Sequence, residues 1–540
     1  MSTTTGADAR SAGSRSLPDG WSEHDLDRVL AALARELPAD RILADPGDLG
    51  EFRDPFAPAA WTDFVPCAVV QPTSVEEVQA VVRVANEHRI PLWTHSQGRN
   101  NGYGGPAPRV NGSLVVSLRR MNRVLHIDPD LAYAVVEPGV RWFDLYAAIQ
   151  EKGHRLMASI TDLGWGSVVG NTLDHGLTYG PYGQDFSAAC GLEVVLADGE
   201  VLRTGMGAMP DNPTWHLYKR GLGPTLDPLF MQSNYGIVTR MGVWLLPYPE
   251  AFHSFFVKAW KEEDLGPLLD TLRRLRLDGT IQGIPSFRNT LLFASVLSRR
   301  SRWTDSAEPI PDGTIDRIAR ELNLGRWSGR GGLWGDEAVV THNFQKIRRA
   351  FESIPGVEVS GELIDPASIA ERENYAERIL GGVPHMEINH VTGWYGGSEH
   401  GGHIGFSPVV ALSSAEGERA NRFLRDLIER EAGLDYQVAM FNINARCMIN
   451  VVMMLFDTAD EAQTRRARDT AKLMVREAAK EGFGEYRAHL DFMDLAADQF
   501  SFGDHAYRRF VEKIKDAVDP NGILSPGKQG IWPADRRPAR

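Results

Sequence analysis

Apolar residues recur along the chain at two spacings, one typical of helices and one of strands. In "TSVEEVQAVVRVANEHRI" (residues 73–90), Val75, Val78, Val82 and Ala85 fall on one face of a predicted helix. Ser74, followed three residues later by Glu, predicts a capping box at the start of that helix. The preceding run "CAVVQP" is typical of a short buried strand.

The first half of the chain mixes such helices with strands. "DLDRVLAALARELP" predicts a helix, and "GSLVVSL", "YAVVEPG" and "GIVTRMGVWLLP" predict strands. The turn "ADGE" joins two apolar runs, which predicts a hairpin. These elements indicate the α+β class.

Beyond about residue 250, longer amphipathic helices such as "EAQTRRARDTAKLMVREAAKEG" alternate with strands. We therefore expect a disordered arm over residues 1–20, a first domain over 21–250, a second over 251–495 and a docked C-terminal segment over 496–540. If "FNINARCMIN" is one strand, alternation places Asn442, Asn444, Arg446, Met448 and Asn450 on one face. That face would make a pocket polar or would meet solvent or helices, and the sequence leaves both open.

Composition excludes several classes of protein. The chain is 43% hydrophobic and 24% charged, with a net charge of −13, which argues against nucleic-acid and anionic-membrane partners. Its three cysteines, Cys67, Cys190 and Cys447, are far apart and form no CxxC, so we expect neither a zinc site nor a disulfide framework. A chain without disulfides fits a cytoplasmic location. No apolar run of about 18 residues predicts a membrane span, and no apolar N-terminal segment predicts a secretory signal.

Two glycine-rich stretches are candidates for binding a nucleotide. In "SQGRNNGYGG" (residues 96–105), glycines allow backbone N–H groups to converge on an anion such as a pyrophosphate. The spacing is neither GxGxxG nor GxxxxGK[ST], and alone it is typical of an ordinary tight loop. A second stretch, "DLGWGSVVGNTLDHG", follows some sixty residues later. Together the two favour a nucleotide cofactor.

The stretch "EHGGHIGFSP" (residues 399–408) places His400 and His403 around two glycines. A metal pair, a covalent link to a cofactor and a structural histidine are all compatible with it. A metal site needs further ligands, and no HExxH motif or cysteine lies nearby. We therefore predict no metal.

The order of "GRNNGYGG", "DLGWGSVVGN", "PYG", "ADGEVLRTGMGA", "SNYGIVT", "GGHIGFSP", "GEYR" and "DPNGILSPGK" closely resembles the vanillyl-alcohol oxidase family, over about residues 52–532. Within the family, the chain looks most like bacterial members that oxidise eugenol. The resemblance implies an FAD-binding domain of the p-cresol methylhydroxylase type over 21–250, a cap domain over 251–495 and a segment over 496–540 that returns to the FAD-binding domain. It also implies a homodimer that oxidises para-substituted phenols, such as eugenol or vanillyl alcohol, with O2 reduced to H2O2.

The resemblance also implies roles for particular residues. His403 matches the histidine bonded to the 8α-methyl group of FAD, whereas no role carries over to His400. The remaining residues expected to bind FAD are Ser96, Gly98, Arg99, Asn100, Asn101, Gly102, Ser167, Asn171, Ile237, Val238 and Lys528.

Tyr103 and the pair Tyr486–Arg487 match the residues that bind the substrate as a phenolate. A phenol has a pKa near 10, and arginine is always charged, so these donors suit an anion. Asp162 matches the acid near flavin N5 that assists hydride transfer and acts as a base. The chain departs from the family at Thr161, where we expect proline, and at Leu177–Thr178, where we expect Val-Gly. The expected pocket residues are Leu177, Tyr179, Trp394, Ser407, Ile443 and Asn450.

Two alternatives stay open. One is a dehydrogenase of the same fold that passes electrons to a cytochrome, in which we expect a tyrosine link elsewhere, so that His403 favours the oxidase. The other is a non-catalytic flavin-binding or ligand-binding protein. Production of peroxide from a phenol separates the three.

Overall fold

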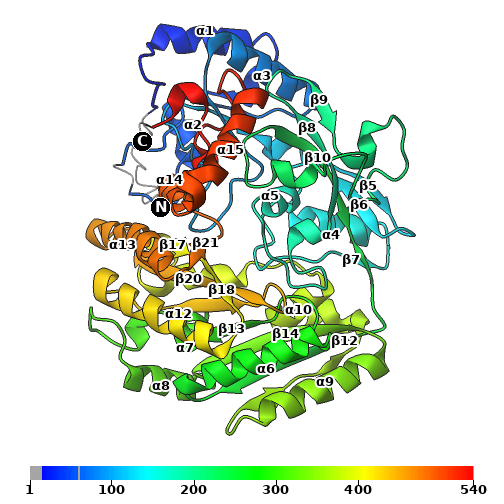
Figure 1. The fold of residues 1–540 in the computed structure, drawn as a ribbon, viewed down its shortest axis with the longest axis vertical. Helices are drawn as coiled ribbons and strands as arrows, with labels where there is room; N and C mark the ends of the chain where they lie inside the picture. The colour runs from blue at the N-terminus through cyan, green and yellow to red at the C-terminus, as the bar shows by residue number, and fades with distance from the viewer. Residues whose placement is uncertain (1–14, 59–60, 539–540) are drawn as a thin grey trace, which may run out of the picture.

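The computed structural model describes residues 15–58 and 61–538, which form two stacked parts (Figure 1). The upper part holds the N-terminal elements and the C-terminal helices, and the lower part holds most of the elements between residues 251 and 485. Helices and sheets are mixed in both, so the expected α+β class is confirmed. Most of the arm expected over residues 1–20 lies outside the described residues. Its end lies against the upper part, where the N–H of Ser16 donates to the carbonyl of Pro66 at 3.3 Å.

A four-stranded sheet of order β1-β2-β4-β3 begins the upper part. The strands are β1 (Ile42–Leu43), β2 (Ala68–Val70), β3 (Leu92–His95) and β4 (Leu114–Ser117), and the helices are α1 (Glu23–Leu33), α2 (Pro46–Leu49) and α3 (Val75–His88). Ser74 caps α3 by accepting the N–H of Glu77 at 3.3 Å. The Glu77 carboxylate accepts the N–H of Thr73 at 2.7 Å, so only half of the predicted capping box forms. Strand β3 ends at His95 and leads directly into the glycine-rich loop.

A five-stranded sheet of order β5-β6-β10-β8-β9 completes the upper part. Its strands are β5 (Val124–Asp128), β6 (Tyr133–Val136), β8 (Ala189–Val195), β9 (Val201–Arg203) and β10 (Ile237–Trp244), and β7 (Leu156–Met157) pairs with β11 (Leu246–Pro247). Helices α4 (Trp142–Glu151) and α5 (Val168–Leu173) follow β6 and β7. Strands β8 and β9 pair in antiparallel fashion across the "ADGE" turn, so the predicted hairpin is confirmed.

The lower part is built on a ten-stranded sheet whose main path is β15-β12-β14-β13-β19-β20-β18-β21, with β16 beside β12 and β17 beside β20. The strands are β12 (Ala251–Ala259), β13 (Ser286–Asn289), β14 (Trp327–Gly335), β15 (Glu358–Ser360), β16 (Leu363–Ile364), β17 (Gly401–Phe406), β18 (Pro408–Ala411), β19 (Val438–Phe441), β20 (Cys447–Asp457) and β21 (Gly484–Glu485). The helices are α6 (Leu265–Leu277), α7 (Thr290–Leu297), α8 (Asp312–Glu321), α9 (Glu337–Glu352), α10 (Tyr375–Arg378), α11 (Gly397–His400), α12 (Ser414–Leu427) and α13 (Glu461–Lys480).

The prediction that "FNINARCMIN" is one strand is wrong. Residues 442–446 form the turn between β19 and β20, which pair in antiparallel fashion from Val438↔Val452 to Phe441↔Ile449. Asn444 holds this turn, because its Oδ1 accepts the N–H groups of Arg446 at 2.8 Å and Cys447 at 3.1 Å.

The two faces of this sheet have different neighbours. Val438, Met440, Met448 and Val452 belong to the hydrophobic core that contains residues of α6, α12 and α13. Asn450 alternates with Val451 and therefore faces the helices, away from the upper part. The expected row of asparagines does not exist.

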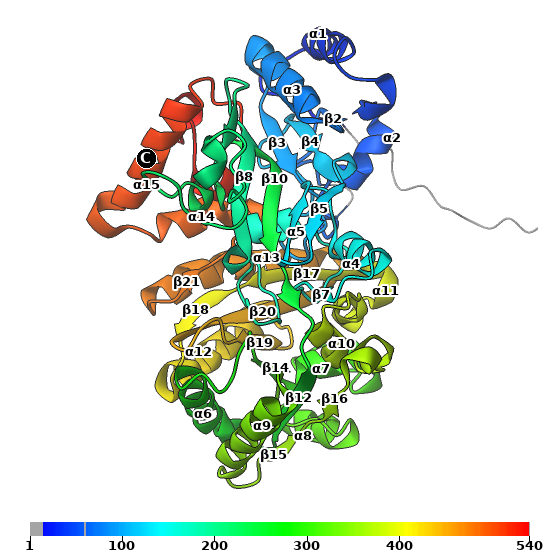
Figure 2. The ribbon, with the colours of Figure 1, turned by 90° about the vertical axis from the view of Figure 1, so that its right-hand side faces the viewer.

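The C-terminal segment lies against the upper part. After α14 (Met493–Asp498) and α15 (Phe502–Val518), Leu524 pairs in parallel with Leu92 at the edge of β3. Buried Lys515 donates to the carbonyls of Asn234 at 2.7 Å and Leu524 at 2.6 Å. Figure 2 shows this red segment beside β8 and β10.

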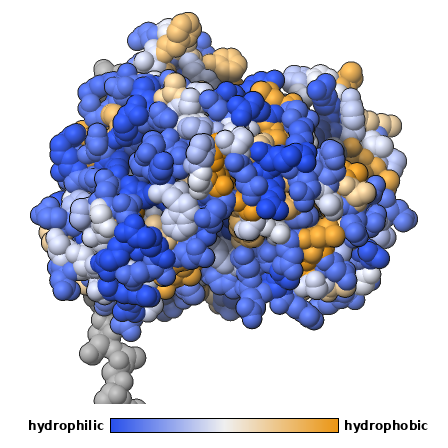
Figure 3. All heavy atoms as spheres, turned by 90° about the horizontal axis from the view of Figure 1, so that it is seen from below, coloured by the Kyte–Doolittle hydropathy of each residue, from blue (hydrophilic) through white to orange (hydrophobic). Residues whose placement is uncertain are grey.

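The face seen in Figure 3 is largely hydrophilic, with its apolar side chains in small separate groups. Within residues 15–58 and 61–538, no helix combines the length and apolar character needed to cross a membrane.

Candidate active site between the two parts

A cavity of about 380 Å³ is lined by residues of both parts and of the C-terminal segment. The upper part contributes the glycine-rich loop, residues 161–179 and the start of β10. The lower part contributes Arg288 and the cavity-facing residues of β19 and β20. Tyr486, Arg487 and Lys528 come from the chain after β21.

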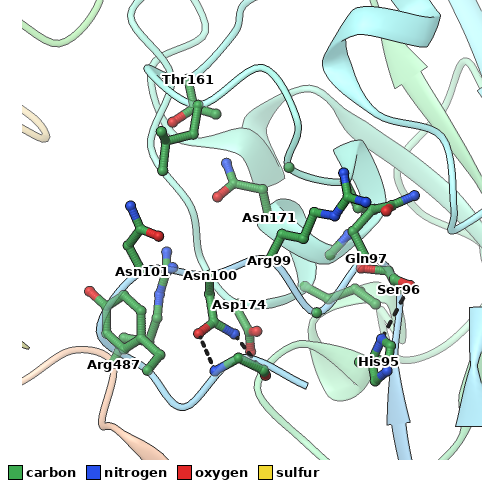
Figure 4. A pocket seen from close by; sticks show the side chains of 18 of the residues that line it. His95, Ser96, Gln97, Arg99, Asn100, Asn101, Thr161, Asn171, Asp174 and Arg487 are labelled. Atoms are coloured by element: carbon green, nitrogen blue, oxygen red, sulfur yellow. Dashed lines mark hydrogen bonds between the residues drawn. The ribbon is translucent and has the colours of Figure 1, made fainter. Parts of the chain in front are cut away.

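The glycine-rich loop forms one wall of this cavity (Figure 4). Asn100 fixes its shape, because Oδ1 accepts the N–H of Gly105 at 2.8 Å and Nδ2 donates to the carbonyl of Gly105 at 3.2 Å. Most residues expected to bind FAD line the cavity: Ser96, Gly98, Arg99, Asn100, Asn101, Ser167, Asn171, Ile237, Val238 and Lys528. Sequence blocks more than 400 residues apart are thus brought to one site.

Three buried polar atoms on the cavity wall suit a polar ligand. His95 Nε2, Ser233 Oγ and Asn234 Oδ1 have no hydrogen-bond partner within the described chain, although their residues line the cavity. Buried polar groups in native proteins are paired with protein, water or ligand. The donors and acceptors of a bound dinucleotide would pair with them, so the residues present are compatible with FAD.

His403 lies on β17 and faces the cavity side of the large sheet. It is opposite Leu455 on β20, two residues from cavity-lining Met453, and paired residues share a face. Gly102 approaches it so closely, at φ +77°, that a Cβ there would lie 2.8 Å from Cε1 and Nδ1 of the imidazole. This contact requires glycine at position 102.

The His403 ring is neutral and without a hydrogen-bond partner among the described residues. Burial, aided by the charge of His489, lowers the pKa of His403 to about 3. A neutral imidazole keeps a nitrogen lone pair available for bonding. His400, by contrast, is exposed at the end of α11.

Tyr103, Tyr486 and Arg487 meet at the cavity wall. The guanidinium carbon of Arg487 lies 4.9 Å from the Tyr103 ring centroid and 5.2 Å from that of Tyr486. The two tyrosine side chains are hydrogen-bonded to each other. Burial raises the pKa of Tyr486 well above its usual value, although the charge of Arg487 opposes this. Tyr486 therefore remains an O–H donor beside a fixed positive charge, which suits an anionic ligand.

Asp162 is buried at the cavity wall with two arginines. Tyr179 donates a hydrogen bond to its Oδ2, Arg288 Nη2 lies 3.2 Å from Oδ2, and Arg330 Nη2 lies 2.9 and 3.0 Å from the two oxygens. Burial alone would raise the pKa of Asp162, but the charges of Arg330 and Arg288 outweigh it and lower the pKa to about 2. Asp162 is therefore an anion at neutral pH.

Sequence reasoning missed the residues that surround Asp162. Arg288 and Arg330 come from neighbouring strands, β13 and β14, and His385 Nε2 lies 3.7 Å from Oδ1 of Asp162. Their local sequences, "PSFRN" and "SGRGG", contain few apolar residues and give no signal that these arginines are buried. The buried ion pairs form only through the pairing of strands that are distant in sequence.

The expected substrate-pocket residues separate into two groups. Leu177 and Tyr179 line the cavity, as does Thr161. Trp394, Ser407, Ile443 and Asn450 are not among the described residues that line it. Trp394 Nε1 instead donates to Asp435 at 2.8 Å, and Ser407 donates its backbone N–H to Glu485 at 3.0 Å.

Comparisons with known proteins match both parts of the chain. The model "FAD binding domain" matches residues 66–205, and "FAD linked oxidases, C-terminal domain" matches residues 404–529. The flavoprotein subunit of 4-cresol dehydrogenase [hydroxylating] from Pseudomonas putida is 36% identical over 95% of this chain and 97% of its own. The chain belongs to the vanillyl-alcohol oxidase and p-cresol methylhydroxylase family.

Solved structures agree with this membership in the vanillyl-alcohol oxidase and p-cresol methylhydroxylase family. The 4-ethylphenol oxidase from Gulosibacter chungangensis has a TM-score of 0.92 and 38% identity, covering 96% of this chain and 100% of that one. Substrate-bound p-cresol methylhydroxylase has a TM-score of 0.90 and 34% identity, covering 96% and 99%. The expected two-domain, p-cresol methylhydroxylase type of FAD-binding fold is thereby confirmed.

The described part of the chain contains no group of three or more His, Cys, Asp or Glu side chains arranged to hold a metal ion.

Proposed function

We propose that the protein is an FAD-dependent oxidase of para-substituted phenols. The observation that carries this proposal is the meeting of Arg487 with Tyr103 and Tyr486 at the cavity wall. Two similar solved proteins are named for 4-ethylphenol and p-cresol, which are both para-alkylphenols. The resemblance to eugenol-oxidising members extends the candidate substrates to 4-allylphenols and 4-hydroxymethylphenols.

The site would bind its substrate as a phenolate. Holding a phenol of pKa near 10 as an anion at pH 7 requires about 4 kcal/mol. Charge-assisted hydrogen bonds contribute about 1.5–3 kcal/mol each, so Arg487 with one or both tyrosines suffices. The negative oxygen then promotes loss of hydride from the benzylic carbon of the para substituent, because the product is a neutral p-quinone methide.

His403 is the residue that we propose to carry FAD covalently through the 8α-methyl group. Its neutral, unpaired ring and the contact with Gly102 support the assignment. The loop from Ser96 to Gly105 would hold the pyrophosphate. When bound, FAD supplies the acceptor for the hydride and passes the electrons on.

Asp162 would act beside the reacting carbon. With its pKa lowered to about 2, it is a weak base in the free protein and acts mainly as a fixed negative charge. Positive charge develops on the benzylic carbon of the para substituent as the hydride leaves, and the carboxylate stabilises it. Addition of water to the quinone methide then gives an alcohol, and loss of a proton gives an alkene or aldehyde.

A dehydrogenase is the second candidate, because the relative from Pseudomonas putida is named a dehydrogenase subunit. The two are separated by mixing the purified flavoprotein with 4-ethylphenol in air. The oxidase consumes one O2 and releases one H2O2 per product. A dehydrogenase forms product at a comparable rate only when a one-electron acceptor such as cytochrome c is added. Absence of product under both conditions would contradict the proposed function.

A further inference from the structure

The site contains two groups of polar residues, Asp162 with Arg288 and Tyr486 with Arg487. They lie at opposite ends of the sheet face that lines the cavity. Strands β13, β19, β20, β18 and β21 are neighbours in that order. Arg288, the partner of Asp162, lies on β13, and Tyr486 and Arg487 directly follow β21. Strands β19, β20 and β18 separate these two ends, so a phenol held by Arg487 would extend its para substituent over this part of the sheet, towards Asp162.

The surface between these ends is apolar. Ala439 and Phe441 on β19 and Val451 and Met453 on β20 all line the cavity. Leu292, Ile388 and Val391 line it as well. The asparagines that would have made this surface polar lie in the turn or on the helix face. A hydroxyl group placed here finds few partners, whereas a methylene group is transferred favourably from water.

Phe441 closes this apolar surface at the Asp162 end. Its ring centroid lies 5.9 Å from that of Tyr179, whose hydroxyl is held by Asp162. The guanidinium carbon of Arg330 lies 4.6 Å from the Tyr179 ring, on which it stacks. Tyr179 is thus fixed by a buried ion-pair cluster and gives Phe441 a rigid backing.

The space behind this wall is small. Tyr179 also lines a second cavity of about 10 Å³, together with Ile284, Pro285 and Arg330. Such a volume holds about one water molecule and no alkyl chain. A longer substituent therefore has no room beyond Tyr179 while Phe441 is in place.

We propose that Phe441, backed by Tyr179, is the specificity-determining residue that restricts this enzyme to phenols with short, apolar para substituents. Alkyl and alkenyl groups are accepted in preference to hydroxymethyl or cinnamyl alcohol groups. This inference rests on the proposed function and adds to it a substrate class and a length limit.

The test is a series of 4-alkylphenols from methyl to pentyl, with 4-hydroxybenzyl alcohol, assayed as kcat/KM with excess acceptor. In the wild type, kcat/KM falls steeply beyond propyl, and 4-ethylphenol exceeds 4-hydroxybenzyl alcohol by at least about tenfold. Phe441→Val raises the ratio of kcat/KM for 4-pentylphenol to that for 4-ethylphenol at least about tenfold. Ala439→Leu, which fills the same surface, lowers this ratio.

Phe287→Val is the matched control. Phe287 lies on neighbouring β13, is also buried, and belongs to the core on the helix side of the sheet. The Phe287→Val variant loses the same kind of ring at a similar cost to stability. It leaves the ratio of kcat/KM for 4-pentylphenol to that for 4-ethylphenol unchanged. Turnover of no phenol by the wild type contradicts the proposed function itself. Turnover with the same ratio in Phe441→Val, Ala439→Leu and Phe287→Val, or a wild-type preference for 4-hydroxybenzyl alcohol, overturns this inference alone.

Discussion

The guanidinium carbon of Arg487 lies 4.9 Å from the centroid of the Tyr103 ring, although the two residues are 384 positions apart. Tyr103 comes from the loop of the upper part, and Arg487 follows the last strand of the large sheet. The proposed phenolate-binding site therefore forms only when the two parts are docked.

Replacing Asp162 by asparagine removes the charge proposed to stabilise the developing cation. We expect hydride transfer, followed as anaerobic flavin bleaching in single turnovers, to slow by about 10²-fold or more. Arg288 and Arg330 lose their buried anionic partner, so stability should fall by about 3–5 kcal/mol. Tyr179→Phe keeps the ring and removes only one donor, and should slow the step less. An Asp162→Asn enzyme that bleaches at the wild-type rate would exclude a role in the reaction.

A covalent flavin at His403 should survive denaturation. After precipitation with acid, the yellow colour should stay with wild-type protein and move to the supernatant in His403→Ala. His400→Ala is the matched control, because that imidazole is exposed three residues earlier. It should keep its colour in the pellet. Release of flavin from the wild type would refute the assignment.

Glu485 makes the stability of the folded protein depend on pH, and a neutral residue at this position would remove that dependence. Burial raises the pKa of Glu485 to about 8, although the N–H groups of Ser407 and Arg487 oppose this. The native state therefore binds more protons than the unfolded state between about pH 4.5 and 8, and stability falls as pH rises through this window. The Glu485→Gln variant should gain stability relative to wild type from pH 5 to pH 8, measured as urea midpoints. If the urea midpoints of the two proteins change with pH in the same way, Glu485 does not titrate between pH 5 and pH 8.

Local patterns predicted the elements well where local forces decide them. The apolar spacing of α3 and the cap at Ser74 follow from neighbours in sequence, and both formed. The "FNINARCMIN" strand failed because Asn444 makes hydrogen bonds that stabilise a turn, which alternation alone does not reveal.

The candidate site was predicted only as far as family motifs reach. Those motifs placed Tyr103, Asp162 and Arg487, and the cavity brings them together. Arg288 and Arg330 were missed because their partner lies 126 and 168 positions away. Such pairing depends on the register of β13 with β14 and on the docking of the two parts.

The central claim is that Arg487, Tyr103 and Tyr486 bind a phenolate whose charge drives loss of hydride. A methyl ether cannot ionise, forfeits charge-assisted bonds of about 1.5–3 kcal/mol each, and would leave a cation beside Arg487. A combined cost of about 5 kcal/mol lowers the rate more than a thousandfold.

The most direct test compares 4-ethylphenol with its methyl ether, 4-ethylanisole, in anaerobic stopped-flow reduction of the flavin, using wild type and Arg487→Met. We predict rapid bleaching by the phenol, more than a thousandfold slower bleaching by the ether, and a large loss with the phenol in Arg487→Met. Bleaching by the ether at a rate comparable to the phenol would contradict phenolate binding and, with it, the proposed function.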